Sequence, residues 1–428
     1  MLGSSLTAVY RTPNFDVSAP VHLIEEVVVR GTGQGLRTLS RTLSIATLSL
    51  AITLAACGGD EGSGAGGDDP IRVGQIVSLT GNYSPLGTEN QKSVALAVDK
   101  INADGGVGGR KIELTVRDDK SLPDQAVLAF NELKDDSDAI IGSPFSNSAL
   151  ATIPLVDREE IPYISLTPAD EQINPVHPYV FVVPATSATY AEAALQYFQA
   201  SKLSKVALAY DTKSSYAVAG AKGLQAKAGQ YGVTVNPIEE FQTTATEFSA
   251  IFTHVRSSDA QALMVWATGA PAVALTKQYA ASGLKIPLVL TGAQASKLFL
   301  DPAGPAAEGV VIASSVGVVG EYLPAGELKT AVDELTTAFT AKYGYPPPQF
   351  AQDGYSGVKL LAAAIEKAGG TDRAKVRDAL EGLSLTTPNG TYAYSAANHS
   401  GLTTDFIAIN MVQAGKFVPT EFSQEKLK

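Results

Sequence analysis

Cysteine, histidine and basic residues are all scarce in this chain of 428 residues. Cys57 is the only cysteine, so the chain can form neither an internal disulfide nor a thiolate metal cluster. The four histidines are scattered, and none falls in a pattern typical of a serine hydrolase or a metal site: His22, His177, His254 and His399. The formal net charge of -11 disfavours nucleic acid, whose binding needs clustered Lys and Arg. We therefore expect no catalytic residue, no bound metal, no cofactor and no nucleic-acid partner.

Long apolar runs are missing as well, and one short run lies at residues 43–54, after a basic segment at residues 37–41. The run is too short to cross a bilayer comfortably as a permanent helix, and this order is typical of a secretion signal. It ends in Leu54-Ala55-Ala56-Cys57, which resembles the lipobox of bacterial lipoproteins. The competing interpretation is a buried helix with an incidental cysteine, but caps and a polar face are missing. We expect lipidation at Cys57 and anchoring to the bacterial membrane, at the cell surface or in the periplasm.

The segments on either side of this signal are not expected to join a folded core. Residues 58–69 consist of Gly, Ala, Ser and acids, a composition typical of a flexible tether. Residues 1–30 fit no secretion signal, so we expect translation to begin at Val28 or Val29 through an alternative start codon. The N-terminal extension and signal thus occupy residues 1–57.

From Pro70 onward, short apolar runs alternate with longer amphipathic segments, the pattern of β-α units that form a parallel sheet. The length and the 45% hydrophobic content allow two cores of ordinary domain size. In a first series we expect strands at 71–79, 111–118, 139–142 and 163–166, and helices at 91–102, 124–134 and 149–158. In a second series we expect strands at 205–210, 233–241, 262–267 and 288–291, and helices at 190–200, 217–231, 248–257 and 272–282. Later elements are expected at 310–315, 327–343, 351–368, 375–382 and 405–412.

Two motifs that suggest chemistry have simpler interpretations. The glycine run at residues 105–109 follows a helix and precedes a strand, which is the reverse of a nucleotide-binding loop, so it is expected to be a turn. Asp118 and Asp119 end a strand, but no His or third acid lies at a matching spacing. We expect these two carboxylates to fix a loop.

Short segments in a fixed order carry a family resemblance. They include RVGQI and SLTG at residues 72–76 and 78–81, INADGGVGGR at 101–110, IIG at 140–142, IPYIS at 161–165 and GL at 283–284. Their order resembles that of the leucine/isoleucine/valine-type periplasmic binding proteins, the solute-binding proteins of ABC transporters. The matching segments span nearly all of the chain from Pro70 to the C-terminus.

The resemblance implies a type I periplasmic-binding-protein fold, in which two α/β lobes, each a doubly wound parallel sheet, close on a ligand as a hinge. Three crossings are expected, near Thr186, Ser315 and Asn398. Lobe 1 would then comprise residues 70–186 and 316–397, and lobe 2 residues 187–315 and 398–428. The resemblance also implies ABC permease and ATPase subunits as partners, and we expect a monomer.

Carried over by position, the resemblance names ligand-binding residues at the carboxyl ends of strands, where open α/β sheets bind ligands. Ser146, in the loop that opens a helix with Asn147, falls where the family supplies a hydroxyl to the ligand carboxylate. The helix N-terminus there would favour an anion, although Ser146 has the alternative role of capping its helix. Thr167 falls where relatives offer backbone groups, and it would replace the hydroxyl that is missing at Ala169.

The side-chain pocket is expected to include Leu86, with Tyr83 nearby, and Tyr216 of the second lobe. The stretch at residues 265–271 also resembles relatives that bind aromatic acids, with Trp266 placed to stack on a ring and Thr268 following it. For Trp266 and Tyr216 a purely structural place in the core remains the competing interpretation.

The second lobe departs from the amino-acid binders after its fourth strand. Those proteins place an acid there to pair with the ligand ammonium, whereas residues 291–294 of this chain read TGAQ, with Gly292 in second place. An ammonium without an anionic partner in a closed cleft is costly. Both a zwitterionic amino acid and an acid that lacks the ammonium therefore stay open as ligands.

The sequence thus predicts the extracytoplasmic solute-binding component of an ABC importer, which captures a branched-chain or other apolar amino acid, or a related small carboxylate, without changing it. An aromatic-acid-binding protein of the same fold and a ligand-sensing subunit of a membrane receptor are alternatives. A secreted hydrolase is a further alternative, and it would need a nucleophile and a base within reach of each other.

Overall fold

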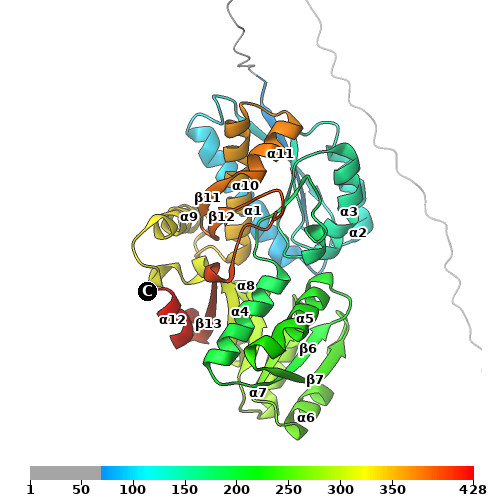
Figure 1. Cartoon of the computed structure of the whole chain (residues 1–428), viewed down its shortest axis with the longest axis vertical. Helices are drawn as coiled ribbons and strands as arrows, with labels where there is room; N and C mark the ends of the chain where they lie inside the picture. Colours follow the sequence, from blue (N-terminus) through cyan, green and yellow to red (C-terminus); the bar gives the residue numbers. More distant parts are fainter. Residues whose placement is uncertain (1–68) are drawn as a thin grey trace, which may run out of the picture. The chain divides into compact units, whose positions relative to one another are not determined.

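The computed structural model describes residues 69–428, which form two large β-sheets and a hairpin (Figure 1). Residues 1–68, with the predicted signal, the predicted lipidation site and most of the predicted tether, lie outside the described residues. The first sheet is parallel throughout, in the order β2 (Ile112–Asp118), β1 (Ile71–Val77), β3 (Ala139–Ile141), β4 (Tyr163–Ser165) and β5 (Val180–Val182). β1 is buried at six of its seven positions, as expected of an inner strand covered on both faces.

Helices pack on both faces of this sheet because its side chains alternate between the faces. Ile141 belongs to the core formed with α1 (Ser84–Ala103) and α10 (Gln349–Ala368). The neighbouring Ile140 belongs to the core formed with α2 (Pro123–Leu133) and α3 (Ser146–Glu159). We call this sheet and its helices lobe 1, to which α11 (Arg373–Glu381) also belongs through its packing on α10.

α10 and α1 lie side by side at close range (Figure 1). A Cβ added at Gly354 of α10 would stand only 2.7 Å from the carbonyl oxygen of Asn90 in α1, so glycine permits the approach. The Asn90 Nδ2 also donates to the Phe350 carbonyl over 2.7 Å. These contacts hold the first turns of α10 in place over lobe 1.

The second sheet and its helices form lobe 2. Its strand order is β14 (Lys416–Pro419), β13 (Ile407–Gln413), β10 (Val311–Ser315), β9 (Leu288–Thr291), β8 (Ala262–Trp266), β6 (Lys205–Asp211) and β7 (Thr234–Phe241). Its helices are α4 (Ser187–Ala200), α5 (Ser215–Lys227), α6 (Ser249–Ser257), α7 (Ala270–Ser282), α8 (Lys297–Ala303) and α12 (Glu421–Lys426). Side-chain caps define the starts of two of them: Thr186 accepts from Thr189 N at α4, and Ser214 accepts from Ala217 N at α5.

The chain passes between the two sheets after β5, after β10, and between β12 (Gly390–Ala393), which pairs with β11 (Ser384–Thr387), and β13. The start of α10 is tied to the first two passages. Gln349 Oε1 accepts from Ser315 N over 2.9 Å, its Nε2 donates to Tyr190 Oη over 2.8 Å, and Gln352 Oε1 accepts from Ser315 Oγ over 2.9 Å. α9 (Glu327–Tyr343) follows the second passage. The exact limits of the two lobes stay a prediction.

The α/β class with two sheets of parallel strands is confirmed, with differences in detail. β13 and β14 are antiparallel, so the lobe 2 sheet is mixed. α1 begins at Ser84, seven residues before the expected start, and it has Pro85 in its first turn. The short elements β5, β11, β12, β14, α8 and α12 were not predicted. No helix within residues 69–428 is both long and apolar enough to span a membrane.

The expectation that Asp118 and Asp119 fix a loop is confirmed. Asp118 Oδ1 accepts from Leu79 N over 2.8 Å, so this N–H group is not available to a neighbouring strand. β1 accordingly ends at Val77, whereas the expected strand ended at residue 79. Asp119 accepts from the hydroxyls of Ser78 and Ser143, each over 2.6 Å. The two acids thereby join the loop after β1 to the loop after β3, the two loops that lead into the candidate site.

Candidate ligand-binding cleft

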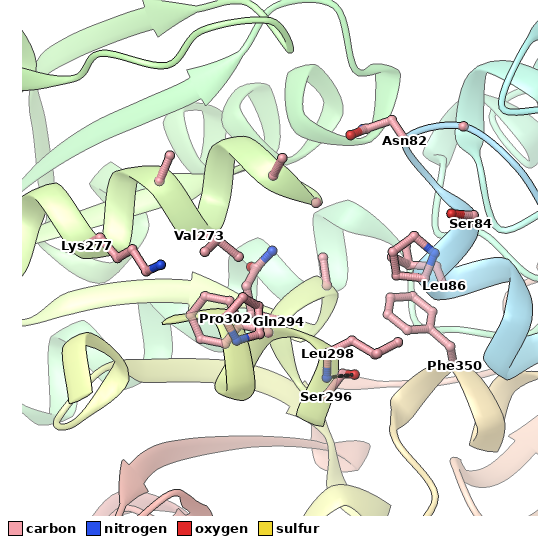
Figure 2. A pocket seen from close by; sticks show the side chains of 17 residues that line it. Asn82, Ser84, Leu86, Val273, Lys277, Gln294, Ser296, Leu298, Pro302 and Phe350 are labelled. Atoms are coloured by element: carbon pink, nitrogen blue, oxygen red, sulfur yellow. Dashed lines mark hydrogen bonds between the residues drawn. The ribbon is translucent and has the colours of Figure 1, made fainter. Parts of the chain in front are cut away.

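Two adjoining hollows lie between residues of lobe 1 and residues of lobe 2. The inner chamber has a volume of about 30 Å³, and the outer cavity, drawn in Figure 2, has about 540 Å³. Leu86, Ala293 and Phe350 line both hollows and so form the boundary between them. In Figure 2, Leu86 and Phe350 stand at one end of the outer cavity, and Lys277 lies toward the other end.

A pair of hydroxyls forms the polar wall of the inner chamber on the lobe 1 side. The Ser146 and Thr167 hydroxyl oxygens are 2.6 Å apart, and both side chains are buried. Ser146 opens α3, whose N-cap residue Phe145 makes no side-chain cap, so the Ser146 hydroxyl is engaged with Thr167 rather than with its own helix. The unpaired N–H groups and the positive dipole end of α3 make this wall suited to a carboxylate.

Aromatic rings form much of the rest of the chamber. Tyr83 stacks on Phe145 with 4.1 Å between ring centroids, and its hydroxyl donates to Ser214 Oγ of lobe 2 over 3.5 Å. Burial raises the pKa of Tyr83 to about 12, and burial likewise raises the pKa of Tyr216, so both phenols are neutral donors at physiological pH. Thr268 of lobe 2 also lines the chamber.

The structure thus brings six predicted residues together around the inner chamber: Tyr83, Leu86, Ser146, Thr167, Tyr216 and Thr268. It brings them from the carboxyl ends of strands in both sheets or from the helices that follow. The family resemblance identified these loops from the order in which their segments follow one another along the chain. The other four predicted residues do not line the chamber.

Asn147 spans the two lobes and points away from the chamber residues. Its Nδ2 donates to the Lys213 carbonyl over 3.1 Å, and its Oδ1 accepts from Ser215 N over 3.0 Å, at the start of α5. Both ends of the amide are therefore occupied by lobe 2 backbone. This arrangement makes Asn147 a link between the lobes.

Trp266, Ala169 and Gly292 are not among the residues that line the chamber. Trp266 is 0% exposed and meets Tyr216 edge-on at 5.2 Å between centroids, so it supports a chamber residue from behind. Ala169 is fully buried as well. At Gly292, an added Cβ would stand 2.2 Å from Gln349 Oε1, so this glycine makes room for the glutamine at the start of α10.

Nine of the fifteen residues that line the chamber were not predicted, and Asp353 of α10 is the one acid among them. Its side chain is 1% exposed, and burial raises the pKa of its carboxyl to about 7, although a hydrogen bond from Asn389 opposes the shift. The Asn389 Nδ2 donates to Asp353 Oδ1 over 2.6 Å. Asp353 is the one acid among the 15 buried residues of this 20-residue helix, and this was the available signal.

The inner chamber as it stands has room for about two water molecules, because one water needs roughly 10–15 Å³ of such volume. A ligand of amino-acid size therefore enters only if the lobes or the boundary residues Leu86, Ala293 and Phe350 move. The contacts of Tyr83 and Asn147 with lobe 2 are the polar links that such an opening has to break.

Known proteins share this architecture. The Leu/Ile/Val-binding protein homolog 3 of Brucella melitensis is 26% identical over 331 residues, which cover 76% of this chain and 87% of that protein. An extracellular ligand-binding receptor from Rhodopseudomonas palustris HaA2 superposes with a TM-score of 0.76 at 23% identity, covering 82% of this chain and 100% of that one. A solute-binding protein of an ABC transporter from R. palustris, solved in complex with benzoate, gives a TM-score of 0.72 at 23% identity and covers 82% and 95% of the two chains.

A family model for periplasmic binding proteins matches residues 70–416, which is nearly the whole of the part that the structure describes. The match begins at the first strand and includes both sheets, so it covers both walls of the cleft. The chain therefore belongs to the periplasmic binding protein family, whose members are extracytoplasmic solute-binding proteins.

Proposed function

We propose that this solute-binding protein serves an ABC importer and captures one small apolar carboxylate, with a branched-chain or similar apolar amino acid as the first candidate. The ligand is bound and released unchanged, and the energy for import comes from partner ATPase subunits. Curated relatives such as the Brucella melitensis protein carry the name of Leu/Ile/Val-binding proteins, which supports this ligand class.

The observation that carries the proposal is the hydroxyl pair at the start of α3. The Ser146 and Thr167 hydroxyl oxygens are 2.6 Å apart, so one hydroxyl proton joins the two. The other proton is left, with the first N–H groups of α3, as a donor on the wall of a chamber whose other surfaces are largely apolar or aromatic. A carboxylate satisfies such donors, and hydrogen bonds to a charged group are the stronger kind. The apolar surfaces of Leu86 and Phe350 favour a hydrocarbon side chain on the ligand.

An aromatic acid is the second candidate. The rings of Tyr83, Phe350 and Tyr216 line the chamber and offer surfaces to a flat ring, and Tyr83 is held by its stacking on Phe145. A relative of the same fold has been solved with benzoate, which supports this alternative. Comparing amino acids with aromatic acids in one thermal-shift screen separates the two candidates, because only a ligand that binds the native state raises the melting temperature.

We expect Ser146→Ala to weaken ligand binding by about 10- to 100-fold, because it removes one hydrogen bond to a charged carboxylate, worth about 1.5–3 kcal/mol. The measurement is titration calorimetry with the best ligand from the screen. Unchanged affinity would mean that the carboxylate binds elsewhere.

Ser148→Ala is the matched control for this variant. Ser148 lies two residues further along α3, and its buried hydroxyl has no hydrogen-bond partner among the described residues. Removing that hydroxyl leaves the chamber wall intact. We therefore expect binding by Ser148→Ala at the affinity of the unmodified protein.

We also propose that Cys57 carries a lipid anchor that keeps the protein at the outer face of a bacterial membrane, as a monomer. The order of basic segment, apolar run and Leu54-Ala55-Ala56-Cys57 supports the proposal. Cys57→Ser is expected to move the protein from the membrane fraction to the soluble fraction and to abolish incorporation of labelled fatty acid. Retention in the membrane fraction would contradict lipidation at this cysteine.

A further inference from the structure

One acidic residue, Asp353, lines the inner chamber, and no basic side chain lines it. Asp353 stands there on the second turn of α10, 1% exposed. The single hydrogen bond to its carboxyl among residues 69–428 comes from Asn389 Nδ2 to Oδ1, at 2.6 Å. The second oxygen has no such bond in this part of the chain, so one acceptor of a nearly buried acid is available to a ligand.

The other polar groups near Asp353 do not neutralise it. The Tyr190 hydroxyl accepts from Gln349 Nε2 over 2.8 Å and makes no hydrogen bond to the carboxyl. Tyr392, whose pKa is raised by burial and also by the negative charge of Asp353, donates instead to the Val183 carbonyl. An ionised Asp353 thus lacks a cationic partner in the described residues, and a buried carboxylate of this kind is costly until a cation joins it.

From this geometry we infer that Asp353 recognises the ammonium group of the ligand, and hence that the ligand is an α-amino acid rather than a simple acid. The inference rests on the proposed function, because it needs the ligand carboxylate at Ser146 and Thr167. The acid that pairs with the ammonium is then Asp353 on α10 of lobe 1. The amino-acid binders place this acid in lobe 2, where residues 291–294 of this chain lack a carboxylate.

Lobe 1 supplies the partners of both charged ends of the ligand, because Ser146, Thr167 and Asp353 all belong to that lobe. Lobe 2 then contributes Tyr216, Thr268 and Ala293 when the cleft closes. An open protein is therefore able to orient its ligand before closure.

The test compares two matched pairs of probes, L-leucine with 4-methylpentanoate and L-phenylalanine with 3-phenylpropanoate, by titration calorimetry. Each acid keeps the carbon skeleton of its partner and lacks only the ammonium. We expect the unmodified protein to bind one of the amino acids about 100-fold more tightly than its matched acid. Asp353→Asn is expected to lose that preference, because a neutral amide does not attract an ammonium, while it still binds the acid.

Proton release supplies a readout that a structural role would not produce. Titration at pH 7 in phosphate and in Tris, whose ionisation heats differ, gives the number of protons released. Because the free carboxyl titrates near pH 7, pairing with an ammonium is expected to release about half a proton. Asp353→Asn is expected to release none. Glu334→Gln serves as control, since Glu334 of α9 accepts from Tyr355 of α10 over 2.9 Å but lies outside the chamber.

The outcomes distinguish a failure of the role of Asp353 from a failure of the proposed function. Binding of the amino acid by Asp353→Asn at unmodified affinity would overturn the role of Asp353 and leave the proposed function standing. Tighter binding of the matched acid by the unmodified protein would do the same, in favour of the aromatic or aliphatic acid. Binding of none of the four probes by the unmodified protein would overturn the proposed ligand class together with this inference.

Discussion

Trp266→Ala is expected to lower the free energy of unfolding by about 3–5 kcal/mol, the range measured for truncating buried aromatic side chains. The indole is 0% exposed and lies among the core residues of both α5 and β8. At Gly220 of α5, an added Cβ would stand 2.2 Å from the indole ring, so the helix backbone lies directly on it. Truncation therefore leaves a large cavity that the neighbouring helix backbone cannot fill without moving.

Urea unfolding followed by circular dichroism measures this change, with Trp266→Phe as the matched control that keeps a ring in the cavity. We expect Trp266→Phe to lose clearly less stability than Trp266→Ala. The sequence-based hypothesis that Trp266 stacks on a ligand ring makes the opposite prediction. A variant that unfolds like the unmodified protein but no longer binds its ligand would favour that hypothesis over the position seen in the structure.

The architecture was predictable because strand burial leaves a local signature. β6, β8 and β9 are short apolar runs between amphipathic helices, and a buried parallel strand has no other composition available to it. β5 and the edge strand β14 have three and four residues, too few to show a period. α1 begins early because Tyr83 and Leu86 are buried against the cleft, a tertiary reason that no helix propensity contains.

The candidate site was predictable to the extent that it lies where parallel strands end. Ser146 and Thr167 follow β3 and β4, which are neighbours in the sheet, so their loops meet. The orientation of each side chain was not predictable, and Asn147 shows why: one residue beyond Ser146 on the same helical turn, it faces α5 instead of the chamber. Trp266 likewise ends a strand at the correct edge but points into the core.

Asp353 could not be placed in the site from the sequence because it reaches the chamber through long-range packing. About 200 residues separate it from Ser146, and α10 comes to lobe 1 only after the chain has completed most of lobe 2. Its position depends on the contact of α10 with α1 at Gly354 and Asn90. The absence of an acid at residues 291–294 was a correct observation. It left the ligand class open because it concerned lobe 2 alone, whereas α10 contributes an acid to the same chamber.

The ionisation of Asp353 is expected to make the stability of the ligand-free protein depend on pH. Burial raises the pKa of this carboxyl from 3.8 to about 7 in the folded protein. Between these two values the folded state keeps a proton that the unfolded state has lost, so stability falls as the pH rises. The loss amounts to about 4 kcal/mol in total, it is complete above about pH 7, and it is absent below the unfolded pKa.

Asp353→Asn isolates this contribution, because the amide keeps the shape of the side chain and cannot ionise. Urea unfolding at pH 4.5, 6 and 8 is expected to show the unmodified protein losing stability relative to Asp353→Asn as the pH rises, and the two curves running parallel above pH 8. Burial also raises the pKa of Asp170, but that acid contributes equally to both proteins and cancels in the difference.

An ammonium ligand reverses the sign of the Asp353 contribution to stability, because it pairs with the ionised form of the carboxyl. Saturating ligand should therefore stabilise the unmodified protein more strongly at pH 8 than at pH 5, and an equal stabilisation at both values would argue that Asp353 and the ligand do not meet.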